Sequence, residues 1–163
     1  MNIVDILTGT PVWVWVVLFF ILHTGMDAVK PSTVSIWQLS VMPLIFIAWS
    51  IYSIYYRCAG CPQYWLMWII PGMIGVVVGY KIAQTVSFRV LSNNFLHLEG
   101  SIQPLLLSLG FFAIKYSLGV IYAVNPALYK EFALMNMDVI ASGLIAGISL
   151  GRFTYFYHQV KNS

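Results

Sequence analysis

Two cysteines in the sequence Cys58-Ala-Gly-Cys61 form the sharpest chemical motif of the chain. Cys-x-x-Cys spacing lets two thiols meet within one small loop, where they can form a disulfide or supply half of a metal site. Arg57, directly before the motif, would favour the thiolate form. The chain has no other cysteine, and no further metal ligands lie close in sequence. We therefore favour inert thiols or a static disulfide, with thiol–disulfide exchange and metal binding as the alternatives.

Lys115 and Asp138 are charged residues that lie within long apolar stretches. A charge near the centre of a bilayer costs roughly 2.5–3.5 kcal/mol on insertion scales, so Lys115 must find a partner, face a bundle interior or extend to the interface. If the two stretches run in opposite directions, both residues lie in the same half of a membrane. The sequence predicts a Lys115–Asp138 ion pair that fixes helix packing. A role in handling a substrate or protons and simple snorkelling of Lys115 are the alternatives.

A second group of polar residues is expected in the other half of the bundle. His23 and Asp27 are one helical turn apart, so they share a face. Lys81 and Arg152 lie at a similar predicted depth, and we favour an interfacial ion pair of Asp27 with either base. A proton-relay or ligand role for His23 is the alternative. The three histidines show no spacing that suits a metal ion or a haem, so the sequence predicts no metal site and no cofactor.

The elements that position these residues are predicted to be membrane helices. Of the 163 residues, 60% are hydrophobic and 8% are charged, whereas about a quarter of the residues of a soluble protein are charged. The charges fall at the ends of long apolar runs, and many Trp and Tyr residues lie near the same ends. This pattern is typical of an integral membrane protein whose environment is the lipid bilayer.

The gaps between charges define five apolar segments, each near the roughly 20 residues that a bilayer core requires. We predict an all-α bundle of about five transmembrane helices that forms a single transmembrane domain over residues 1–163. The helices are expected at about 11–29, 35–56, 62–84, 102–124 and 132–157. The residues before the first segment include Asp5 but no Lys or Arg, so the first helix is expected to remain as an uncleaved anchor.

The segment between the third and fourth helices is the longest polar connection. Apolar residues at 86, 88 and 90 alternate with polar residues at 87 and 89, which is the period of a β-strand. Asn93-Asn94 suits a two-residue turn. The sequence predicts a short β-hairpin over about 86–99, with Phe95, His97 and Glu99 on one face of the returning strand. A disordered loop is the alternative.

Five glycines recur at a spacing that favours close helix packing. Gly75 and Gly79 lie in the third predicted helix, and Gly143, Gly147 and Gly151 lie in the fifth. Small residues four apart let two helices approach closely within a membrane. We predict that these faces meet inside one bundle, with contact between protomers as the alternative.

The distribution of basic residues predicts the orientation. With the N-terminus outside, one side of the membrane collects Lys30, Lys81, Arg89, Arg152 and Lys161, and the other collects Arg57 and Lys130. Five basic residues against two favour an outside N-terminus and a cytoplasmic C-terminus. A net charge of +3 is accounted for by these flanks and by anionic lipid, so no nucleic-acid partner is expected.

Two stretches carry a resemblance to known proteins. Residues 7–15 (LTGTPVWVW) resemble the start of a family of uncharacterised bacterial inner-membrane proteins. A later string is similar to that family and, more loosely, to the CcdC-like membrane proteins associated with cytochrome c maturation; it comprises Leu98-x-Gly100-Ser101, Pro104-Leu105, Leu107, Phe112 and Lys115-Tyr116. The likeness extends over most of the chain in its pattern of spans. It implies a five-helix bacterial inner-membrane fold and defines no catalytic residue.

Two classes of function follow from these residues. We favour a non-enzymatic membrane protein, a small carrier or a scaffold subunit, organised around Lys115 and Asp27. The alternative is a thiol–disulfide or cytochrome-maturation accessory factor that uses Cys58 and Cys61, in an arrangement that resembles membrane thiol oxidases of the DsbB kind. Such oxidases relay electrons through a second cysteine pair, which this chain lacks. Motifs of serine hydrolases, zinc proteases and nucleotide-binding loops are also lacking. Expected partners are lipid, other membrane proteins or further copies of the chain.

Overall fold

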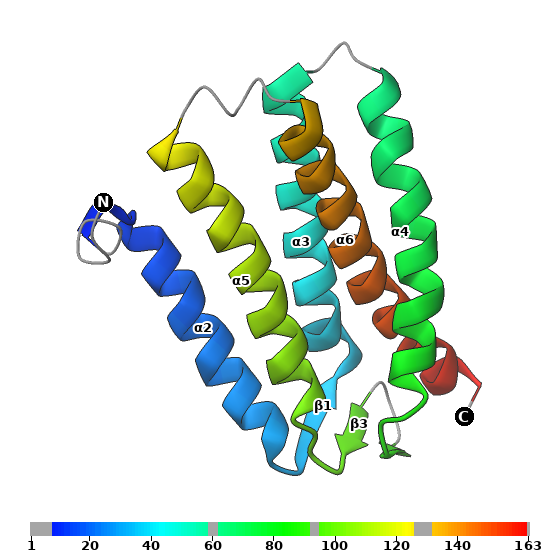
Figure 1. Ribbon diagram of the computed structural model, residues 1–163. Helices are drawn as coiled ribbons and strands as arrows, with labels where there is room; N and C mark the ends of the chain where they lie inside the picture. Colours follow the sequence, from blue (N-terminus) through cyan, green and yellow to red (C-terminus); the bar gives the residue numbers. More distant parts are fainter. Residues whose placement is uncertain (1–7, 59–61, 92–94, 126–131, 163) are drawn as a thin grey trace.

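The computed structural model describes residues 8–58, 62–91, 95–125 and 132–162 and is shown in Figure 1. The described residues form five long helices and a small sheet of three short strands. In chain order these are α2 (Val12–Val29), β1 (Ser32–Ser35), α3 (Ile36–Cys58), α4 (Pro62–Ala83), β2 (Phe88–Leu91), β3 (Phe95–Leu98), α5 (Gln103–Val124) and α6 (Phe132–Lys161). The expected mainly helical fold with five helices is therefore confirmed.

Proline marks several helix boundaries. Pro11 immediately precedes α2, Pro62 is the first residue of α4, and Pro104 lies in the first turn of α5. The first turn of a helix tolerates proline because its N–H groups have no partner within the helix. At the other end of α2, Lys30 adopts an extended backbone before Pro31, as steric repulsion from the proline ring requires.

Four of the helices, α2, α4, α5 and α6, are long and apolar enough to cross a membrane. Within α3, the apolar segment found among the described residues is Ile36–Tyr52, which falls short of this length. The sequence predicted five spans of similar length, so by this criterion the prediction holds for four. The helix α6 also continues to Lys161, beyond the expected end near residue 157. Its last turns are held against the sheet, where Val160 packs on a buried apolar cluster.

Successive helices run in alternating directions, and the two ends of the chain lie at opposite ends of the bundle (Figure 1). The closest packing joins α4 to α6; α3 packs against α6, and α2 packs against α5. Contacts between α5 and α6 are few. The bundle therefore consists of a pair, α2 and α5, beside a trio, α3, α4 and α6.

Glycines allow α4 and α6 to pack backbone against backbone. A Cβ atom added at Gly75 would lie 2.6 Å from the carbonyl oxygen of Leu144, and Cβ atoms at four other glycines would collide with backbone of the facing helix. Those four are Gly79, Gly143, Gly147 and Gly151. These contacts lie within one chain. Because glycine has no side chain, the backbones of the two helices come into direct van der Waals contact along this seam.

The sheet is antiparallel in the order β1-β3-β2. The pairing of β2 with β3 opposes Phe88 to Leu98 and Arg89 to His97, whereas the Asn93-Asn94 turn lies outside the described residues. The sequence predicted a two-stranded hairpin, and that prediction was incomplete. Residues 32–35 form a third strand because they are extended after Pro31 and pair with the open edge of β3, with Thr33 opposite His97.

The sheet closes one end of the bundle. Leu96 and Ala83 are fully buried in a cluster with Ile36, Tyr155 and Phe156, so strand β3 packs on the ends of α3, α4 and α6. The segment after β3 is joined to α2 by a hydrogen bond from the Ser101 N–H to the Ala28 carbonyl. The preceding residue, Gly100, has a φ of 80°, which suits glycine. This end of the molecule is therefore tied together by strands, whereas the described residues of the opposite end include no strand.

Candidate functional site

An ion pair joins the two parts of the bundle. Lys115 lies in the middle of α5 and Asp138 in the first half of α6. The Lys115 Nζ atom lies 2.6 Å from Asp138 Oδ1 and also donates a hydrogen bond to Ser142 Oγ. Ser142 in turn donates to the backbone carbonyl of Asp138, 2.6 Å away. One ammonium group is thus held by two side chains that lie one turn apart on α6.

The two side chains of this ion pair are buried to different degrees. The side chain of Asp138 is 4% exposed and that of Lys115 is 18% exposed. Each charge compensates the other in a setting where an unpaired charge would be strongly unfavourable. Because α5 and α6 have few other contacts, the ion pair is a main connection across the seam between the pair and the trio.

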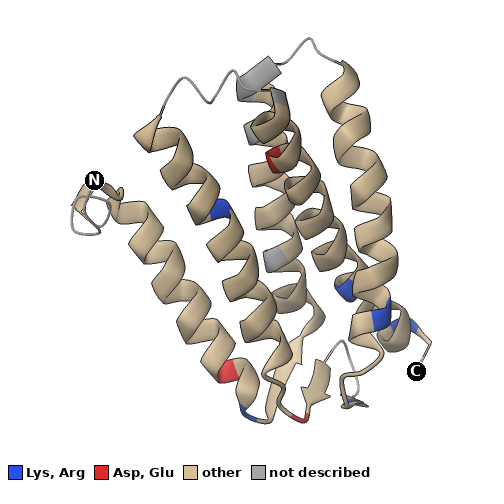
Figure 2. Ribbon diagram, viewed as in Figure 1, with Lys and Arg blue, Asp and Glu red and all other residues tan. Residues whose placement is uncertain are grey.

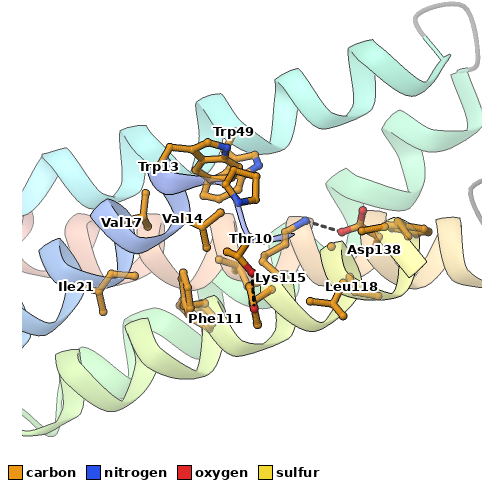
Figure 3. A pocket seen from close by; sticks show the side chains of 18 of the residues that line it. Thr10, Trp13, Val14, Val17, Ile21, Trp49, Phe111, Lys115, Leu118 and Asp138 are labelled. Carbon is orange, nitrogen blue, oxygen red and sulfur yellow. Dashed lines mark hydrogen bonds and ion pairs between the residues drawn. The ribbon is translucent and has the colours of Figure 1, made fainter. Parts of the chain in front are cut away.

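A cavity of about 660 Å³ lies next to this ion pair, between α2, α3, α5 and α6 (Figure 3). This volume falls within the roughly 300–1,000 Å³ that is typical of small-molecule sites. The wall is rich in aromatic side chains: Trp13, Phe46, Trp49, Phe111, Phe112, Tyr116 and Tyr122. It extends from Ile21 and Ile145 to residues 9–11 and Val124, at the end of the bundle opposite the sheet.

Few polar groups line the cavity. Lys115 and Asp138 are the charged side chains among the described lining residues. The hydroxyl groups of Thr10 and Tyr116 are hydrogen-bonded to each other at 2.9 Å, and Ser50 Oγ donates to the carbonyl of Ser142 at 3.3 Å. An apolar, aromatic chamber with one ion pair in its wall can bind a small, largely apolar molecule and orient it by one polar contact.

The other charged residues lie elsewhere. Figure 2 shows that most of the described Lys, Arg, Asp and Glu residues gather at the end of the bundle with the sheet. Lys115 and Asp138 lie instead within α5 and α6. These two residues are therefore separated from most of the other described charges, and their side chains are largely buried.

The expected ion pair of Asp27 with Lys81 or Arg152 is not formed. Asp27 instead pairs with His23 on the same helix, with 3.3 Å between Asp27 Oδ2 and His23 Nδ1, and both side chains are exposed. The reason is the arrangement of the helices: α2 packs against α5, whereas Lys81 and Arg152 belong to α4 and α6.

The two other histidines lie apart from the site and are engaged elsewhere. His97 Nδ1 lies 3.3 Å from Thr33 Oγ1 across the sheet, and His158 is paired with Asn162. Across the described ranges, no three His, Cys, Asp or Glu side chains are placed to hold a metal ion. The side chain of Cys58 and the whole of Cys61 lie outside the described residues, so thiol chemistry stays a prediction from the sequence.

Several residues of the site were missed by the analysis of the sequence. Ser142 could have been found, because it lies one turn after Asp138 and so shares its face of the helix. The contact of Thr10 with Tyr116 joins residues 106 positions apart, and no local pattern predicts it. The same holds for Trp13 and Trp49, whose rings meet edge-to-face 5.6 Å apart over the cavity.

Comparison with known proteins gives one partial relative. The chain is 41% identical over 49 residues to an uncharacterized protein, PM0739, of Pasteurella multocida (strain Pm70). The match covers 30% of this chain and 38% of the length of that protein. No family model and no solved structure matches the chain. The comparisons thus show a partial bacterial relative without assigning a family.

Proposed function

We propose that the chain is a multi-pass protein of a bacterial inner membrane that binds a small apolar molecule in the cavity beside Lys115 and Asp138. On this proposal it acts as a non-enzymatic carrier or binding subunit. The observation that carries the proposal is the coincidence of a 660 Å³ aromatic-walled cavity with a buried ion pair.

The outward faces of the helices support a membrane location. Large apolar side chains are exposed along α2 and α4, among them Phe19 at 70% and Met73 at 67%. Soluble monomers rarely expose continuous apolar surface on this scale, because it would be hydrated at a large cost. The backbone polar groups of these segments are satisfied within helices, which lipid requires.

We include α3 as a fifth span. Its 23 residues would extend roughly 34 Å at a rise of 1.5 Å per residue, which exceeds a hydrocarbon core of about 30 Å. It also runs between the same two ends as its neighbours (Figure 1). The sheet end is proposed to be cytoplasmic, with the cavity reaching the outer side, because the basic residues at or toward this end are Lys30, Lys81, Arg89, Arg152 and Lys161.

Filling the cavity tests the proposed binding function. Gly119 lines the cavity and Gly110 does not, and a Cβ atom at either position meets nothing within 4 Å. Gly119→Phe should therefore fill the cavity, and Gly110→Phe serves as a matched control on the same helix. Purified protein in lipid nanodiscs would be photolabelled with dodecane that carries a diazirine, and the labelled residues mapped by mass spectrometry.

We expect saturable labelling of cavity-lining residues in the wild type, which excess plain dodecane removes. Gly119→Phe should lose most of this labelling and Gly110→Phe should retain it, because only the first side chain occupies the binding volume. Equal, non-saturable labelling confined to the outward faces in all three proteins would refute a binding role for the cavity.

A further inference from the structure

The ammonium group of Lys115 has a hydrogen-bond donor to spare. A lysine ammonium carries three N–H donors and no acceptor. Two of these donors go to Asp138 Oδ1 and Ser142 Oγ, and the described part of the chain offers it no third acceptor. Because Lys115 lines the cavity and is the more exposed member of its ion pair, the third N–H is the donor that a bound molecule can reach.

The charge of the site is already balanced. Lys115 and Asp138 form a closed pair at 2.6 Å, and the remaining described lining residues are uncharged. A bound anion or cation would add one net charge beside largely aromatic and aliphatic walls, which is unfavourable. An uncharged molecule adds no such cost, so the electrostatics of the cavity select against ionic ligands of either sign.

Three hydroxyl groups of the wall already take part in hydrogen bonds. Thr10 and Tyr116 are hydrogen-bonded to each other, and Ser50 donates to the Ser142 carbonyl. A ligand that forms one hydrogen bond with Lys115 and is apolar elsewhere therefore matches the cavity without breaking an existing contact. Its polar atom has to be an acceptor, because the group that it meets can only donate.

We infer that the cavity binds an uncharged apolar molecule with a carbonyl-type oxygen, and that Lys115 donates a hydrogen bond to this oxygen. This inference rests on the proposed function, since it names the ligand class of the same cavity. Lys115 is then a specificity-determining residue, and Asp138 a positioning residue that holds the ammonium group and balances its charge.

Competition among ligands of equal chain length tests this inference. The diazirine-labelled dodecane would be displaced from wild-type protein by dodecane, 2-dodecanone, dodecanesulfonate or dodecyltrimethylammonium. We expect the ketone to compete at a concentration roughly ten- to a hundredfold lower than dodecane, as one hydrogen bond to a charged group predicts. Both ions should compete no better than dodecane.

A double variant separates the hydrogen bond from folding. Lys115→Met with Asp138→Leu removes the donor, leaves no unpaired charge and adds no new N–H group, so dodecane should still displace the probe while the ketone loses its advantage. Persistence of that advantage in the double variant, or an ion that competes better than the ketone, would overturn the inference. Failure of every compound to displace the probe would instead refute the proposed function itself.

Discussion

Lys115 is enclosed where α5 meets α6, and its contacts with Asp138 and Ser142 are the most buried polar contacts of the described chain that involve a charge. The two charges depend on each other. Removal of one partner leaves the other unpaired in an apolar setting, whereas removal of both leaves no charge to compensate. The energetic importance of the pair is therefore visible only when single and double variants are compared.

Lys115→Met should lower the free energy of unfolding by about 3 kcal/mol or more, because Asp138 is left as a buried charge. The double variant Lys115→Met, Asp138→Asn should recover most of this loss. Thermal unfolding in detergent would measure both, and Lys81→Met, which removes an exposed charge from α4, should stay within about 0.5 kcal/mol of the wild type. A double variant less stable than Lys115→Met would contradict this account of the pair.

At the scale of elements, the seam between α4 and α6 differs from every other helix contact in the bundle that the structure describes. It is the only one built from a row of glycines whose backbone atoms touch the facing backbone. The contact of α5 with α6, in contrast, is sparse and leaves room for the cavity. Close packing on one side of α6 and an open chamber on the other are both set by side-chain size.

Gly147→Ala should weaken the seam, because its new Cβ would collide with the backbone carbonyl of Gly72. Overpacking of this kind costs about 1–3 kcal/mol. Gly110→Ala is the control, since its Cβ meets nothing within 4 Å and alanine favours the helix by up to about 1 kcal/mol. Unfolding of the two variants in the same detergent should give opposite signs, and equal stability would argue against backbone packing at this seam.

The limits of the sequence are also clearest at the scale of elements. Long apolar runs and the prolines beside them predict helices, because lipid and backbone sterics act on local sequence. The pairing of Lys115 with Asp138 was anticipated because a buried charge needs a partner. Strand β1 was missed, since Ser32–Ser35 has no alternating pattern and pairs with residues at least 60 positions away. The predicted partner of Asp27 was wrong because the local sequence does not show which helices lie side by side.

The cavity could likewise not be predicted from the sequence. Its walls come from four helices, and aromatic residues such as Trp13 and Trp49 are equally consistent with an interfacial belt until their helices are placed. What the sequence supplied was the polar part of the site. Its volume and lining depend on where packing is incomplete, which is a property of the assembled bundle.

At the scale of the whole molecule, the proposed function requires a bilayer around the outward faces of the helices. Most of the described charged residues lie at one end of the bundle (Figure 2). Large apolar side chains are exposed along the helices. The proposed arrangement puts the sheet end in the cytoplasm and the opening of the cavity on the outer side. This arrangement determines which residues are accessible to water and from which side of the membrane.

Cysteine accessibility in intact bacterial cells tests the proposed membrane arrangement. Single cysteines at Phe19, Thr33 and Asn125 would be introduced with Cys58 and Cys61 replaced by serine, and treated with a membrane-impermeant maleimide. We expect Asn125→Cys to react in intact cells, Thr33→Cys to react only after permeabilisation, and Phe19→Cys to stay protected in both despite its exposure in the isolated chain. Rapid reaction of Phe19→Cys in permeabilised cells would place that face of α2 in water and contradict the account.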